Sequence, residues 1–182
     1  MTESKTNAFI GLIGAVVFGV LAIIVPFLKM TGFGFITETG TVPVINVDYT
    51  ADIFWDGGTT KLTGVPAVDV AFSDFVDSSI QIIWDIAGLW MFVFIGLGLI
   101  GFLLVAIPPV QKLAGMEPMN LGFFGLIAGL VATVVHYLLI VLGALLDEAF
   151  EGGIENLNLI MLVLMIVGWV ALIVGYIYGS KD

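Results

Sequence analysis

Residues 121–146 read LGFFGLIAGLVATVVHYLLIVLGALL, an apolar run that contains no aspartate, glutamate, lysine or arginine. A helix rises about 1.5 Å per residue, so about 20 such residues cross the roughly 30 Å hydrocarbon core of a bilayer. Three further apolar runs lie at 8–28, 80–107 and 157–178. The sequence therefore predicts an all-α membrane protein, with a bundle of four transmembrane helices in one membrane domain, residues 1–182.

Composition agrees with a chain that is surrounded by lipid. Hydrophobic residues make up 60% of the chain and charged residues only 11%, whereas soluble domains are about a quarter charged. Cysteine is absent, which excludes disulfides and thiolate chemistry. The net charge is −10 and arginine is absent, so binding to nucleic acid, which needs clustered basic residues, is excluded as well.

The placement of lysine predicts the orientation of the chain. The two termini and the 108–120 connection carry three lysines and three acids, whereas residues 29–79, 147–156 and Asp85 carry two lysines and twelve acids. Lysines in short loops favour the cytoplasmic side. We therefore predict a multi-pass protein of the cell membrane that has both termini in the cytoplasm and an acidic outer face.

Residues 29–79, between the first two apolar runs, predict a small extracellular β-sheet. The segments 41–49, 51–55, 59–63 and 68–76 are rich in β-branched or aromatic residues or alternate in polarity, and the last is either a strand or the approach to the second span. Gly57 and Gly58 lie between two of these segments, where a tight hairpin turn requires positive φ. A sheet this small is marginal alone, so we expect it to dock on the outer ends of the helices; a flexible loop is the alternative.

Small residues at intervals of three and four predict where the helices approach one another closely, because lipid gives no hydrophobic drive for helices to associate. Packing within one bundle is the simpler interpretation, and a seam between copies, on the first span, is the alternative. Pro108 and Pro109 are expected to end the second helix. The predicted packing seam consists of Gly11, Ala15, Gly19, Gly122, Gly125 and Gly129.

His136 is the one intramembrane residue expected to titrate, and an ionisable residue at this depth is a candidate functional residue. Asp85, the nearest acidic candidate, lies at the outer end of the second run, about 10–15 Å away along the membrane normal by helix rise. A neutral structural histidine and a gating or relay residue are both consistent with the sequence.

The acidic outer segments raise the question of cation binding, since Ca²⁺ takes several oxygen ligands. EF-hand spacing is absent, so we predict a solvated acidic surface with at most weak binding of divalent cations, and no metal site, cofactor or catalytic residue. The acids concerned are Asp48, Asp52, Asp56, Asp69, Asp74, Asp77, Asp147, Glu148, Glu151 and Glu155.

The order of segments resembles the claudin and peripheral-myelin superfamily of four-pass proteins: a long β-rich loop after the first span, a short inner loop and a short second outer loop. The first outer loop of that family carries a tryptophan, then Gly-Leu-Trp, then two cysteines. Here Trp55 corresponds to the first tryptophan, Gly88-Leu89-Trp90 falls inside the second span, and the cysteines are missing. The resemblance implies a four-helix bundle crowned by a small sheet, and a role in adhesion.

We accordingly predict a non-enzymatic membrane protein that acts in adhesion or self-assembly, or as a structural subunit of a membrane complex. Its partners would be the lipid bilayer and other membrane proteins, including further copies of itself. The alternative is a channel or transporter component that passes cations or protons with the help of His136. An intramembrane enzyme is the least supported class, because the spans carry neither a His/Asp cluster nor a serine dyad.

Overall fold

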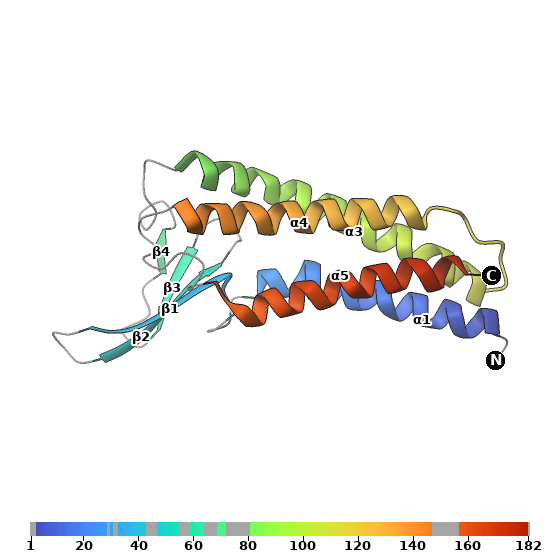
Figure 1. Cartoon of the computed structure of the whole chain (residues 1–182), viewed down its shortest axis with the longest axis horizontal. Helices are drawn as coiled ribbons and strands as arrows, with labels where there is room; N and C mark the ends of the chain where they lie inside the picture. Colours follow the sequence, from blue (N-terminus) through green and yellow to red (C-terminus); the bar gives the residue numbers. More distant parts are fainter. Residues whose placement is uncertain are drawn as a thin grey trace. The chain divides into compact units, whose positions relative to one another are not determined.

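The computed structural model describes residues 3–28, 30, 33–42, 47–54, 59–63, 69–71, 81–146 and 157–181. Over these residues the protein is mostly helical (Figure 1), and four helical segments are long and apolar enough to cross a membrane. They run over Glu3–Phe27, Asp85–Leu113, Gly122–Gly143 and Leu159–Ser180. The predicted set of four apolar helices is confirmed, and it indicates a multi-pass membrane protein.

The first span combines three kinds of helix. Helix α1 covers Glu3–Phe18, a π-helical segment covers Gly19–Ile24, and a 3₁₀ turn covers Val25–Phe27. The backbone N–H of Val25 donates to the carbonyl of Val20, five residues earlier, as a π-helical turn requires. Pro26 follows directly and has no N–H to donate, so the regular α-helical hydrogen-bond pattern could not have continued through it.

Helix α3 runs over Gln81–Leu113 and passes through Pro108 and Pro109, so the prediction that the proline pair ends this helix is wrong. Both prolines are buried. The helix ends instead at Leu113, two residues before Gly115, which has a φ of +74°. The Gly115 N–H donates to the carbonyl of Lys112, and the next N–H, of Met116, donates to the carbonyl of Gln111. This pair of bonds is a Schellman cap, for which glycine is the favoured residue.

Helices α4, Gly122–Leu146, and α5, Leu159–Ser180, agree with the predicted runs to within two residues. The 22 residues of α5 extend about 33 Å, enough to cross a bilayer. Asn158 caps its N-terminus: the side-chain Oδ1 accepts hydrogen bonds from the backbone N–H of Ile160 at 2.9 Å and of Met161 at 3.3 Å.

Four strands form one antiparallel sheet in the order β1-β2-β3-β4, with bounds Ile36–Val42, Val47–Phe54, Thr59–Thr63 and Asp69–Ala71. The β-rich stretch at 41–49 is divided between two strands, because residues 41–42 end β1 and residues 47–49 begin β2. These two strands pair with Ile36 opposite Ile53 and Val42 opposite Val47. The turn predicted at Gly57-Gly58 lies outside the described residues.

The chain divides into two compact units. The helical unit comprises Met1–Val25, Val93–Val135 and Leu164–Asp182, and the sheet unit comprises Pro26–Phe92 and His136–Val163. Within the helical unit, the start of α1 and the ends of α3 and α5 lie at the same end (Figure 1). Helices α3, α4 and α5 each contribute residues to both units.

Candidate functional site

A partly buried polar chain links two strands to the start of α5 in the sheet unit. The side-chain hydroxyl of Thr37 on β1 donates to Oδ1 of Asp52 at 2.8 Å, directly across the strand pair. The Nδ2 group of Asn158 donates to the same hydroxyl oxygen at 3.1 Å. The Asp52 side chain is 0% exposed, so each of these bonds compensates the cost of removing polar atoms from water.

Backbone contacts reinforce this link. The N–H of Asn158 donates to the carbonyl of Phe35 at 3.0 Å, and Leu157 forms an isolated antiparallel bridge with Ile36 on β1. Ile36 and Phe35 are themselves buried. The start of α5 is therefore joined to the edge of the sheet by both backbone and side-chain hydrogen bonds.

His136, the candidate functional residue on α4, is 1% exposed. Its ring meets the ring of Phe35 in an edge-to-face arrangement, with 5.9 Å between the centroids. Phe35 immediately precedes β1, so the histidine lies against the same part of the sheet unit that the polar chain holds. Asp85, the acid considered as its partner, has an exposed side chain on α3.

The acidic residues considered for cation binding fall into three groups, of which Asp48 on β2 and Asp69 on β4 form the first. Asp52 does not belong to a solvated acidic surface, because it is fully buried. The residues at 147, 148, 151 and 155 lie outside the described residues, as do those at 56, 74 and 77. Among the side chains that the structure describes, no group of three or more histidines or acids is arranged to hold a metal ion.

In the helical unit, the small residues of the first span face α5. A Cβ atom added at Gly11 would lie 2.6 Å from the backbone nitrogen of Gly179, and one at Gly14 would lie 2.6 Å from the carbonyl oxygen of Ala171. Both distances are too short for any side chain. Ala15 is 0% exposed. The glycine face of α1 is therefore filled by the protein's own α5, and a contact between copies would have to use another face.

The space beside the small residues of α4 is likewise occupied by neighbouring helices of the same chain. A Cβ at Gly125 would lie 2.7 Å from Cβ of Leu104 on α3, and one at Gly129 would lie 2.8 Å from a methyl group of Leu172 on α5. Gly122 and Gly19 are less crowded, at 3.1 Å from aromatic side chains. The predicted seam residues thus pack inside one chain, where they allow the backbones of α3, α4 and α5 to approach one another closely.

A hydrogen bond that the sequence did not reveal joins α4 and α5 in this unit. The indole Nε1 of Trp169 donates to the hydroxyl oxygen of Thr133 at 2.7 Å. That hydroxyl in turn donates to the carbonyl of Gly129, one turn earlier, at 2.8 Å. Thr133 is fully buried, so the indole N–H is satisfied by protein in a region where water is not available.

In the comparisons with known proteins, no family model, no curated protein and no solved structure matches this chain. The resemblance to the claudin and peripheral-myelin superfamily therefore remains one of segment order alone.

Proposed function

We propose that this chain is a non-enzymatic membrane protein that acts by binding other membrane proteins, further copies of itself included. It would serve in adhesion or self-assembly, or as a structural subunit of a membrane complex. Its sheet would lie on the outer side of the cell membrane and both termini in the cytoplasm, as lysine placement and the claudin-like order of segments favour.

The observation that carries this proposal is the polar link between the sheet and α5. Thr37, Asp52 and Asn158 are joined by hydrogen bonds of 2.8 and 3.1 Å around a fully buried carboxylate. A segment held in this way is ordered before it meets a partner, and preorganisation reduces the entropy lost on binding. A simple linker between two spans would need no such network.

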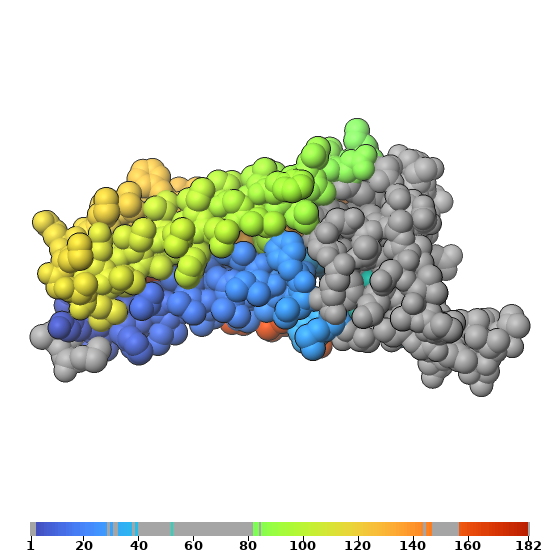
Figure 2. Space-filling view, turned by 180° about the vertical axis from the view of Figure 1, so that it is seen from behind, coloured from blue at the N-terminus to red at the C-terminus, as the bar shows by residue number. Residues whose placement is uncertain are grey.

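Helix α3 offers a second surface for partners. Only 28% of its most apolar stretch is buried, against 44% in the first span. Figure 2 shows α3, in green to yellow, exposed beside α1, in blue. The exposed apolar side chains include Leu99 and Leu103 in the helical unit and Leu89 and Phe92 in the sheet unit. Either lipid or a helix of another protein can cover them.

The surroundings of His136 support a structural role more than a role in ion passage. Its 1% exposure and its contact with the Phe35 ring place it among packed side chains. The channel alternative therefore becomes an outcome of the test and not a second proposal.

Crosslinking and native mass spectrometry of the full chain, extracted in mild detergent with and without Ca²⁺, test the proposal. We expect species larger than one chain, and we expect Asn158→Ala to reduce them because it loosens the sheet. Thr39→Ala, an exposed position on β1, is the matched control. A strict monomer under all conditions, together with a pH-dependent ion flux in liposomes that His136→Ala abolishes, would favour the channel instead.

Single cysteines test the proposed orientation, and the chain contains none that would interfere. In intact cells, an impermeant thiol reagent should label Thr39→Cys, because this exposed residue belongs to the segment proposed to lie outside. Ser180→Cys should be labelled only after the membrane is permeabilised. Labelling of the second variant in intact cells would reverse the orientation.

A further inference from the structure

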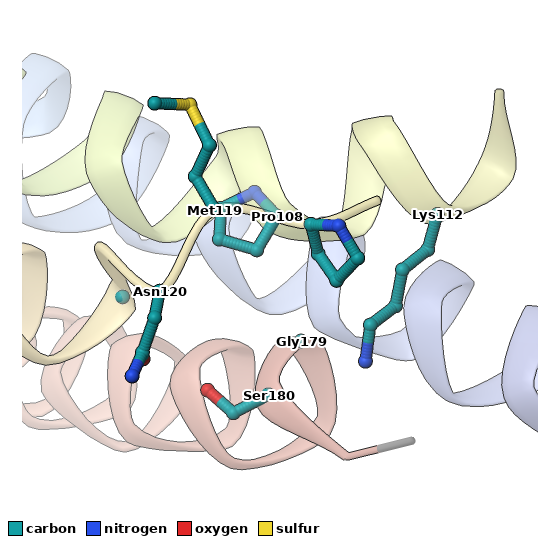
Figure 3. A pocket seen from close by; sticks show the side chains of 8 residues that line it. Pro108, Lys112, Met119, Asn120, Gly179 and Ser180 are labelled. Carbon is teal, nitrogen blue, oxygen red and sulfur yellow. The ribbon is translucent and has the colours of Figure 1, made fainter. Parts of the chain in front are cut away.

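A pocket of about 250 Å³ opens in the helical unit, at the end where α3 stops and α4 begins. It is lined by the last turns of α3, the connection that follows, the first residue of α4 and the end of α5. In the close view of Figure 3, Lys112 and Asn120 extend toward α5, where Gly179 and Ser180 lie, while Met119 points the opposite way. Three segments thus bring an ammonium, an amide and a hydroxyl group to one cavity.

We propose that this pocket binds the phosphate of an anionic phospholipid headgroup. The position of the pocket along the helices indicates that the phosphate belongs to a membrane lipid. Lys112 is the next-to-last residue of α3, Gly122 is the first of α4 and Ser180 is the last of α5. Each of the three apolar helices has one of its termini here, so the pocket lies at the level of the lipid headgroups.

This end of the chain carries as many lysines as acids, three of each, so it suits an anion better than the rest of the strongly acidic chain does. The ammonium group of Lys112 donates to the backbone carbonyl of Lys181, which holds it beside the pocket. The Lys181 ammonium lies 4.5 Å from the centre of the Tyr178 ring. Helix α4 begins at the pocket, so the positive end of its dipole adds to the field of the two lysines.

The walls of the pocket are fixed by specific contacts. The Oε1 atom of Gln111 accepts the backbone N–H of Met119 at 2.8 Å, which holds the connection over the end of α3. A Cβ at Gly179 would lie 3.2 Å from the Pro109 ring, and one at Gly122 would lie 3.1 Å from the Tyr176 ring. These glycines let α5 approach α3 and α4 closely and so set the width of the cavity.

The size of the pocket matches a headgroup and not a whole lipid. Its 250 Å³ is below the roughly 300–1,000 Å³ of sites for drug-sized ligands. The acyl chains would remain outside, against apolar side chains such as Val110 on α3 and Phe123 on α4, which are 48% and 50% exposed. One phosphate in the pocket with its chains along the helices satisfies both the polar and the apolar surfaces.

The test uses the full chain in nanodiscs of phosphatidylcholine with or without phosphatidylglycerol, followed by native mass spectrometry of the retained lipid. We expect one phosphatidylglycerol to be retained in preference to phosphatidylcholine. Lys112→Gln should weaken its binding about fivefold, the factor that corresponds to roughly 1 kcal/mol per lysine at a membrane surface. Lys5→Gln, which removes the same charge at the exposed start of α1, is the matched control and should change binding less than twofold.

Two further arms make the outcome decisive. Ser180→Phe fills the pocket without changing any charge, and it should abolish preferential retention even if Lys112→Gln folds poorly. Equal losses in Lys112→Gln and Lys5→Gln would show general attraction to the membrane surface and would overturn the site. If inorganic phosphate at millimolar concentration displaces phosphatidylglycerol completely, the pocket is a site for free phosphate and the lipid assignment is wrong.

Discussion

The contacts inside the helical unit differ in kind from the contacts inside the sheet unit. In the helical unit backbones touch: a Cβ at Gly101 on α3 would lie 2.6 Å from the Cα of Gly129 on α4. In the sheet unit backbone hydrogen bonds pair the strands, and polar side-chain contacts such as the Thr37–Asp52 hydrogen bond add to them.

This difference follows from the solvent around each set of contacts. Lipid is as apolar as a leucine side chain, so helices inside it gain little from burying apolar area and depend on close packing and a few hydrogen bonds. Strand residues outside the hydrocarbon gain from burial of side chains and from satisfied polar groups. Substitutions that add atoms should therefore damage the helical unit most, and substitutions that remove polar atoms should damage the sheet unit most.

The largest effect is expected at Gly101. Gly101→Ala places a methyl group against the backbone of α4, which cannot move aside as a flexible side chain can. We expect a loss of about 3 kcal/mol in the free energy of unfolding, at the upper end of the range for overpacked interiors. Thermal or denaturant unfolding of the purified chain in detergent, followed by circular dichroism, measures it.

Gly96→Ala is the matched control for this prediction. Gly96 lies on the same helix, and a Cβ there would meet nothing within 4 Å. The substitution should leave stability unchanged or raise it slightly, because alanine favours the helix over glycine by up to about 1 kcal/mol. Equal destabilisation by the two variants would contradict the view that glycine contacts hold α3 to α4.

Apolar length made the four helices predictable from the sequence, because only a helix satisfies its backbone in lipid within one segment. Helix ends were less predictable: the proline pair at 108–109 is a common stop signal, yet the cap at Gly115 ends α3. The end of β1 at Val42 did carry a signal in the sequence, because the next residue is Pro43 and proline has no N–H to donate to a neighbouring strand. Propensity alone does not reveal which residues pair across a sheet.

The candidate site was only partly visible in the sequence. His136 stood out as a lone ionisable group in an apolar run, but Asp52 looked like one more surface acid. Its burial depends on Thr37 lying opposite it, and this register is a property of the folded sheet. Asn158 did carry a local signal, because an asparagine near the start of an apolar run is typical of a helix N-cap.

An intermediate effect is expected at Asn158. Asn158→Ala removes the cap of α5 and the hydrogen bond to Thr37 together, and it should cost about 2 kcal/mol, since a cap alone contributes about 1 kcal/mol. Asn158→Ser keeps an oxygen that can cap the helix but loses the Nδ2 donor, so it should cost about half as much. Hydrogen exchange of the β1 and β2 amides should increase in both variants.

This experiment also separates capping from docking. If Asn158→Ser matches the wild type both in stability and in exchange of the strand amides, the bond to Thr37 contributes nothing and the sheet is held by other contacts. The link between the sheet and α5 would then not support the proposed function.

The smallest effect is expected at a hydrogen bond between two side chains of the helical unit. Thr133→Val preserves the shape of the side chain but removes the oxygen that accepts the Trp169 indole N–H at 2.7 Å. Such bonds in membrane proteins contribute about 0.6 kcal/mol on average and up to about 1.7, so we expect a loss of about 1 kcal/mol in the same unfolding assay. Thr133→Ser, which keeps the hydroxyl, should lose less. A loss above that of Gly101→Ala would reverse the order argued here, because hydrogen bonding, not backbone approach, would then dominate the helical unit.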